Sequence, residues 1–188
     1  MRYYPKSKNQ VDDIQKLTVA KSVRRRVPWL MIGLLGGLAA AGVITSFEET
    51  ISQNLILASF IPLIVYISDA VGSQMEAFAI RDFALHTRLK FHNYFLRQFI
   101  IVAIISFILA IALFVISLVI KQDLKISIVL SISLFLAILS SISTGLLVPY
   151  IFNKINLDPA NASGPIATVI QDILSVIIYF NVAHLLLS

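Results

Sequence analysis

Asp172 is the residue whose position in this sequence points most strongly to chemistry. It lies near the middle of the last apolar run, residues 157–188, which contains no Lys or Arg that could neutralise it. An ionisable side chain at the centre of a membrane span costs at least ~2.5 kcal/mol on insertion scales, and the spans that keep one usually use it on an ion or proton pathway. The sequence therefore predicts a functional carboxylate here, with a mobile cation as its counter-charge.

A second carboxylate, Asp69, lies about midway along another apolar run, residues 54–80. Because the two runs are expected to cross the membrane in opposite directions, Asp69 and Asp172 would lie at similar depth and could face one site. Pro62 and Gly72 are expected to weaken the helix near Asp69 and to free carbonyl oxygens as ligands. Helical spacing places further polar residues with each carboxylate, on one face of its run: Ser73 and Glu76 with Asp69, and Gly164, Thr168, Ser175 and Tyr179 with Asp172.

The side chains on these two faces offer oxygen ligands. The sequence has no Cys, and its three His residues lie away from both faces. Carboxylate, hydroxyl, carbonyl and water are the ligands of Mg²⁺, Ca²⁺ and Mn²⁺, and Mg²⁺ often binds through one or two carboxylates while keeping several waters. Two alternatives stay open: the aspartates could be protonated and hydrogen-bonded between helices, and Glu76 could simply be solvated.

The elements that position these residues are membrane helices. Apolar residues make up 58% of the 188-residue chain, the mean hydropathy is +0.88, and runs of some twenty apolar residues recur, which indicates transmembrane helices. We expect an all-α, polytopic integral membrane protein with five transmembrane helices per chain, no cleavable signal peptide and no soluble catalytic domain, and hence not an enzyme. The expected spans are residues 28–47, 54–80, 98–120, 126–152 and 162–187.

The net charge of +5 reflects topology and does not suggest nucleic-acid binding. Thirteen of the fifteen Lys and Arg residues lie in the N-terminal segment, in residues 81–97 or in residues 153–160, which places these segments in the cytosol, the N-terminus inside and the C-terminus outside a plasma membrane. Residues 1–27 are predicted to be a basic cytosolic tail with an amphipathic juxtamembrane helix at 10–23, or a movable helix that contacts a pore. Residues 28–188 are the predicted cation-transport domain.

Several stretches resemble the transmembrane domain of the MgtE family of magnesium channels and transporters, from about residue 12 onward. The resemblance implies a homodimer with a cation path at its two-fold axis, lined by the second and fifth spans of each subunit. It also implies that Asp172 is the central metal-binding aspartate and that Thr168 lines the path. The matching stretches are DDIQKL, RVPWL, IPLI, GSQ, LDPANASGP and IIYF.

The sequence departs from the family's pattern in the second span. Ser68-Asp69-Ala70 stands where the family usually has Gly-Gly-Asn, and Met75-Glu76 replaces small uncharged residues. The extra carboxylates could alter ion selectivity or supply a second binding or proton-coupling group. The cytosolic magnesium-sensing domains of better-known members are not expected in this chain, nor is gating through them.

The sequence leads to three hypotheses. The first is a channel or transporter for divalent cations, above all Mg²⁺ but also Mn²⁺ or others, with lipid and a second copy as partners. The second is an exchanger that couples cation movement to Na⁺ or H⁺ through Asp69 and Glu76. The third is a membrane scaffold subunit that transports nothing. For the first, the predicted metal site consists of Asp172, Asp69, Thr168, Ser73 and Glu76.

Overall fold

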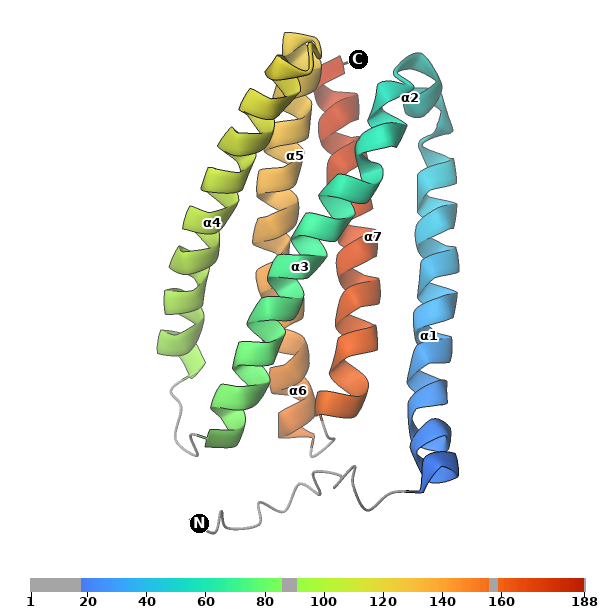
Figure 1. The fold of residues 1–188 in the computed structure, drawn as a ribbon, viewed down its shortest axis with the longest axis vertical. Coiled ribbons are helices and arrows are strands. Elements are labelled where there is room, and N and C mark those ends of the chain that lie inside the picture. Colours follow the sequence, from blue (N-terminus) through green and yellow to red (C-terminus); the bar gives the residue numbers. More distant parts are fainter. Residues whose placement is uncertain (1–17, 86–90, 156–158, 188) are drawn as a thin grey trace.

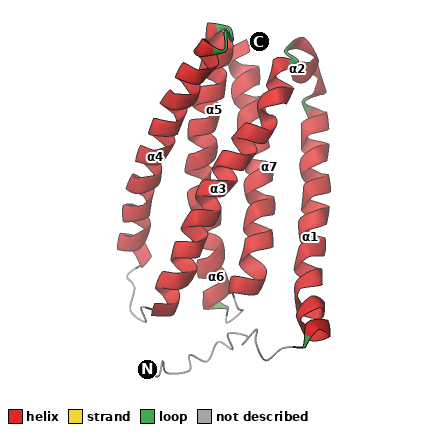
Figure 2. Cartoon of the chain, viewed as in Figure 1, coloured by secondary structure: helices red, strands yellow, loops and turns green. Residues whose placement is uncertain are grey.

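The computed structural model describes residues 18–85, 91–155 and 159–187, and this part of the chain consists of helices joined by short turns (Figures 1 and 2). Residues 10–17 of the predicted amphipathic helix lie outside the described residues. The helices are α1 (Val19–Ser46), α2 (Glu48–Gln53), α3 (Ile56–Leu85), α4 (Phe91–Val119), α5 (Leu124–Ile142), the π-helix η2 (Ser143–Leu147), α6 (Val148–Lys154) and α7 (Pro159–Leu187).

Among the described residues, five helical segments are long and apolar enough to cross a membrane, and α5, η2 and α6 together form one of them. The predictions of an all-α fold and of five transmembrane helices are therefore confirmed. The basic residues of α1, the end of α3 and Lys154 lie at the end of the bundle where α7 begins, which we call the basic end (Figure 1). That this end faces the cytosol stays a prediction.

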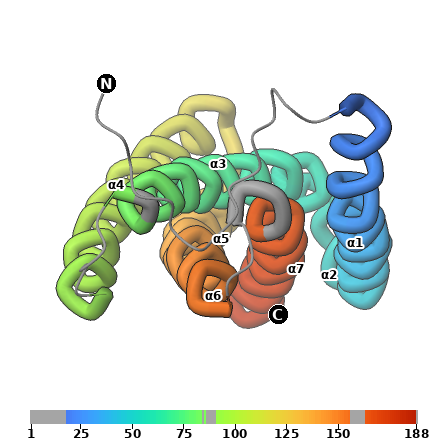
Figure 3. The backbone as a smooth tube through the Cα atoms, turned by 90° about the horizontal axis from the view of Figure 1, so that it is seen from below, coloured from blue at the N-terminus to red at the C-terminus, as the bar shows by residue number. Residues whose placement is uncertain are grey.

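The helices are arranged around α3, which crosses over α5 and α7 and packs against both (Figures 1 and 3). On one side of this centre α4 packs on α5, and on the other side α1 packs on α7. The core lies where the three central helices meet, and its fully buried members include Leu57, Ile64, Leu130, Ile138 and Phe180. Because α3 and α7 both pack into this core, the polar side chains that each helix carries are held in a fixed position relative to each other.

Helix α1 is the most loosely attached span, since none of its residues is buried. It begins at Val19 rather than near residue 28, because Ala, Lys and Arg are good helix formers and extend the helix beyond the apolar run. Pro28 consequently lies inside the helix. Gly36 packs directly against α7: an added Cβ would lie 2.2 Å from a methyl carbon of Val169.

The fourth span is interrupted by η2, which the sequence analysis did not foresee. In this π-helix Gly145 lies against α3: a Cβ on Gly145 would lie 2.6 Å from the carbonyl oxygen of Gly72. Helix α3 itself runs unbroken through Pro62 and Gly72, so these residues do not interrupt it, and the expected freeing of carbonyl oxygens stays a prediction. Gly72 serves instead for close packing of two helices, as small residues commonly do in membranes.

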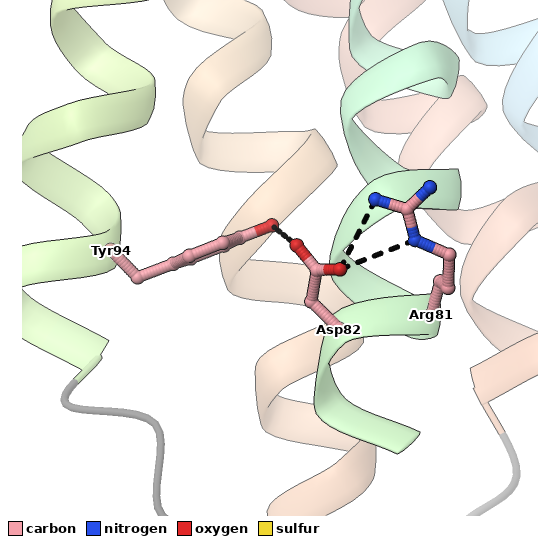
Figure 4. A network of polar contacts seen from close by, with 3 residues as sticks. All are labelled: Arg81, Asp82 and Tyr94. Carbon is pink, nitrogen blue, oxygen red and sulfur yellow. Dashed lines mark hydrogen bonds and ion pairs between the residues drawn. The ribbon is translucent and has the colours of Figure 1, made fainter. Parts of the chain in front are cut away.

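At the basic end α3 is linked to α4 by polar contacts (Figure 4). The Tyr94 hydroxyl donates to one carboxylate oxygen of Asp82 at 3.1 Å, and Arg81 pairs with the other at 3.2 Å. Phe91 of α4 stacks on Tyr150 of α6, with ring centroids 3.9 Å apart. These contacts join α3, α4 and α6 at the basic end.

Candidate cation site

The site lies on one face of two crossing helices, α3 and α7. The carboxylate of Asp69 on α3 lies beside the hydroxyl of Thr168 on α7 and the hydroxyl of Ser73 one turn along its own helix, and it interacts with both. The first of these contacts joins the two helices at the depth where the sequence allowed a shared site. The structure therefore brings Asp69, Thr168 and Ser73 together, while their role as metal ligands stays a prediction.

Asp172 lies one turn beyond Thr168 on α7 and is half-buried. It interacts electrostatically with Asp69, so two groups of like charge share one region of the bundle. No Lys or Arg occurs in residues 54–80 or 159–187 to offset them. Taking an uncompensated charge out of water is costly, and a bound cation would remove most of that cost for both carboxylates.

Glu76 lies two turns nearer the basic end than Asp69 and is only 7% exposed, so it is not the solvated residue that its sequence position allowed. The fully buried Ser163 of α7 donates a hydrogen bond to its Oε1. Beside this pair, Gly164 leaves room, because an added Cβ would lie 4.0 Å from the same oxygen. Glu76 also interacts electrostatically with Asp69. A line of three carboxylates thus runs from Asp172 toward the basic end.

The polar stripe predicted on the last span divides into two. Thr168 and Asp172 are half-buried on one face of α7, which together with the face of α3 that carries Asp69 and Ser73 we call the open face. Ser175 and Tyr179 are instead buried in the core. The Tyr179 hydroxyl donates to the carbonyl oxygen of Leu57 at 2.9 Å, and Ser175 meets Ser68 of α3. The prediction of one continuous stripe was wrong. Helix α7 packs on several other helices, and these contacts bury Ser175 and Tyr179 while Thr168 and Asp172 stay partly exposed.

Gln171 was not among the predicted site residues; it is 1% exposed and contacts α5 and η2 as well as its own helix. Its Nε2 is within hydrogen-bonding distance of the Ala137 carbonyl oxygen and of the Ser140 and Ser175 hydroxyls, and its Oε1 accepts from Thr144. The one signal in the sequence was an amide directly before Asp172 in an otherwise apolar run.

The donor set suits a hydrated hard cation better than a tightly caged one. Within the described ranges, no three His, Cys, Asp or Glu side chains form a group that could hold a metal ion. One chain offers two half-buried carboxylates with neighbouring hydroxyls, which fits an ion that keeps several waters. Because Ser73 is exposed and both aspartates are partly so, this face needs a cover other than hydrocarbon.

Comparison with known proteins shows which family this chain resembles. The family model named MgtE, described as a divalent cation transporter, matches residues 61–182, which include Asp69, Glu76, Thr168 and Asp172. The chain is 30% identical over 167 residues to the magnesium transporter MgtE of Enterococcus faecalis and 32% identical over 161 residues to that of Bacillus subtilis. It is 26% identical over 166 residues to the magnesium transporter MgtE of Thermus thermophilus.

These matches cover most of this chain but a smaller part of each relative. They extend over 88%, 85% and 87% of this chain, and over 37%, 36% and 36% of the three relatives in the same order. The chain therefore spans a little more than a third of the length of the curated relatives it matches.

Proposed function

Since the chain belongs to the MgtE family of divalent cation transporters, we propose that it moves Mg²⁺ across the membrane along a path lined by α3 and α7. A family of transporters agrees with the expectation that the chain is not an enzyme. The named relatives are magnesium transporters, which favours Mg²⁺ over Mn²⁺ and other divalent ions that oxygen ligands also accept.

The proximity of Thr168 on α7 to Asp69 on α3 is the observation that carries this proposal. This contact joins the two helices beside Asp172, and the resulting face holds two carboxylates and hydroxyls but no cationic side chain from either span. In the proposal Asp172 is the central ligand and Asp69 an auxiliary one. The hydroxyls of Thr168 and Ser73 contact the ion's water, and Glu76 attracts cations nearer the basic end.

The path is proposed to lie at the axis of a homodimer. Asp69 and Asp172 are half-buried in a single chain, and in a bilayer their exposed parts would otherwise meet hydrocarbon, which is costly for an ionisable group. A second copy covers this face and creates a water-filled path between the two. One cation then offsets an Asp172 from each subunit, and the lipid contacts fall on the outer surface of α4.

The test is Mg²⁺ flux into liposomes that contain the purified protein and a magnesium-sensitive dye. We expect flux down the Mg²⁺ gradient with no other gradient imposed, competition by Mn²⁺, and none in liposomes without protein. Absence of flux for every divalent ion tested would contradict the proposal and favour a scaffold role. Flux only against an opposing Na⁺ or H⁺ gradient would favour an exchanger.

Glu76 is the specific reason to keep the exchanger as a second candidate, because a buried carboxylate beside a hydroxyl can exchange a proton for a cation. Under the leading proposal, Glu76→Gln keeps the contact with Ser163 but removes the charge that concentrates cations. We therefore expect the half-saturating Mg²⁺ concentration to rise about tenfold with the maximal rate retained, as measured in the liposome assay. The matched control is Glu48→Gln, on the exposed surface of α2 at the opposite end of the bundle.

The exchanger is selected by a different result. If flux through the unmodified protein depends on an opposing H⁺ gradient and Glu76→Gln loses that dependence, Glu76 carries the coupled proton and the channel proposal fails.

A further inference from the structure

We propose, building on the proposed function, that Gln171 is a positioning residue for the cation site: its amide fixes the rotation of α7 about its own axis and so determines where Asp172 points. Gln171 precedes Asp172 directly but points into the core, whereas Asp172 points to the open face. Neighbouring residues of an α-helix differ by about 100° in direction, so fixing one of them fixes the other.

Gln171 is held from several sides. Its Oε1 accepts a hydrogen bond of 2.8 Å from Thr144 of η2, and its Nε2 lies 3.0 Å from the Ala137 carbonyl oxygen and 3.2 Å from the Ser140 hydroxyl, both on α5. Nε2 also lies 3.0 Å from the Ser175 hydroxyl on α7. The two amide hydrogens are shared among these acceptors. A rotation of α7 would break contacts to α5 and η2 together.

The same arrangement reaches α3 through Ser175. The hydroxyls of Ser175 and Ser68 are 2.7 Å apart, and both side chains are fully buried. Ser68 precedes Asp69, just as Gln171 precedes Asp172. Two pairs of neighbours therefore divide in the same way: Ser68 and Gln171 form the inner polar contacts, while Asp69 and Asp172 face the proposed path.

Polar contacts are the means by which a membrane helix can be held at one rotation. Lipid tails are as apolar as Leu side chains, so burying an apolar face gives little preference for one rotation over another, and packing and interhelical hydrogen bonds decide. Residues that orient a metal ligand from behind typically change metal affinity or activity 10–100-fold when they are mutated. Gln171 fits this role, because it is the neighbour of Asp172 on α7 but points into the core and not to the open face.

The first test separates positioning from general stability. Gln171→Met keeps the length of the side chain and removes the amide. We expect the half-saturating Mg²⁺ concentration for liposome flux to rise at least about tenfold, with the maximal rate per folded protein changed less. Thr144→Val, a milder change that removes the donor to Oε1, is expected to shift the same quantity in the same direction. Ser106→Ala, a buried serine of α4 bonded to its own helix at Ala103, is the control and is expected to shift nothing.

The second test does not depend on transport. Because the sequence has no Cys, Asp172→Cys introduces a single thiol. The rate at which a charged, water-soluble reagent modifies this thiol reports how far position 172 is exposed on the open face. Adding Gln171→Met, or Thr144→Val if the first does not fold, is expected to lower that rate. Adding Ser106→Ala is expected to leave it unchanged.

Two results would overturn the proposal. One is a folded Gln171→Met or Thr144→Val protein with an unchanged half-saturating concentration, even if its maximal rate falls, because that is the mark of a merely structural role. The other is an unchanged labelling rate at position 172. If the unmodified protein carries no divalent cation at all, the proposed function fails, and the labelling test alone still decides whether Gln171 sets the rotation of α7.

Discussion

Asp172→Asn is expected to lower Mg²⁺ flux at least about a hundredfold, because a direct ligand should matter at least as much as the groups that orient it. Asn keeps the size and hydrogen-bonding ability of the side chain but removes the charge that attracts the ion. The substitution also leaves Asp69 as the main carboxylate on the open face. The measurement is the initial rate in liposomes with the magnesium-sensitive dye, normalised to the amount of inserted protein.

The matched control is Asp123→Asn, in which the same substitution is made at the N-cap of α5, at the other end of the bundle. The Asp123 carboxylate accepts a hydrogen bond from the backbone N–H of Lys125, and Asn caps a helix about equally well, so flux should stay at the unmodified level. Assembly is followed for both variants by cross-linking in the membrane. Loss of the oligomer in Asp172→Asn together with loss of flux would assign Asp172 to packing and contradict its role as a ligand.

Gly145→Ala is expected to destabilise the bundle. The new Cβ would lie 2.6 Å from the Gly72 carbonyl oxygen, and since the neighbour is backbone, no change of rotamer relieves the clash. Inserting carbon into a packed contact typically costs about 1–3 kcal/mol, so the melting temperature in detergent should fall. Because η2 also carries Thr144, the half-saturating Mg²⁺ concentration should rise in the same variant.

Gly37→Ala is the control for this prediction. Nothing lies within 4 Å of a Cβ at Gly37 in the described chain, and Ala is a better helix former than Gly by about 1 kcal/mol. Its melting temperature should stay equal or rise. Equal melting temperatures for Gly145→Ala and the unmodified protein would show that α3 and η2 can separate without cost.

The sequence was sufficient to predict the membrane spans. A helix that crosses a bilayer needs a run of about twenty apolar residues, and such runs are easy to recognise in a sequence. It also allowed Asp69 and Asp172 to face one site, since both were expected at similar depth on spans of opposite direction, but it could not decide whether they do. The beginning of α1 was misplaced because helix formation does not stop where the apolar residues do.

The details that the sequence did not predict all depend on which neighbour each helix meets. Ser175 and Asp172 have the same helical spacing as other members of the predicted stripe, yet one contacts α3 in the core and the other lies on the open face. Gln171 was overlooked because its partners belong to a different span: Ala137 and Ser140 lie on α5, and Thr144 lies in the π-helix η2. Periodicity along one helix carries no information about such partners.

The packing of α1 on α7 has a consequence for the synthesis of the protein. Helix α1 is synthesised before α7, so α1 must remain in the bilayer without its main neighbour until α7 has been made, about 7–30 seconds at ~5–20 residues/s. Its apolar surface, with no buried residue in the finished fold, is suited to that interval. The arrival of α7 brings Val169 onto Gly36 and Asp172 beside Asp69 in one event, so the proposed cation site is completed only when α7 packs.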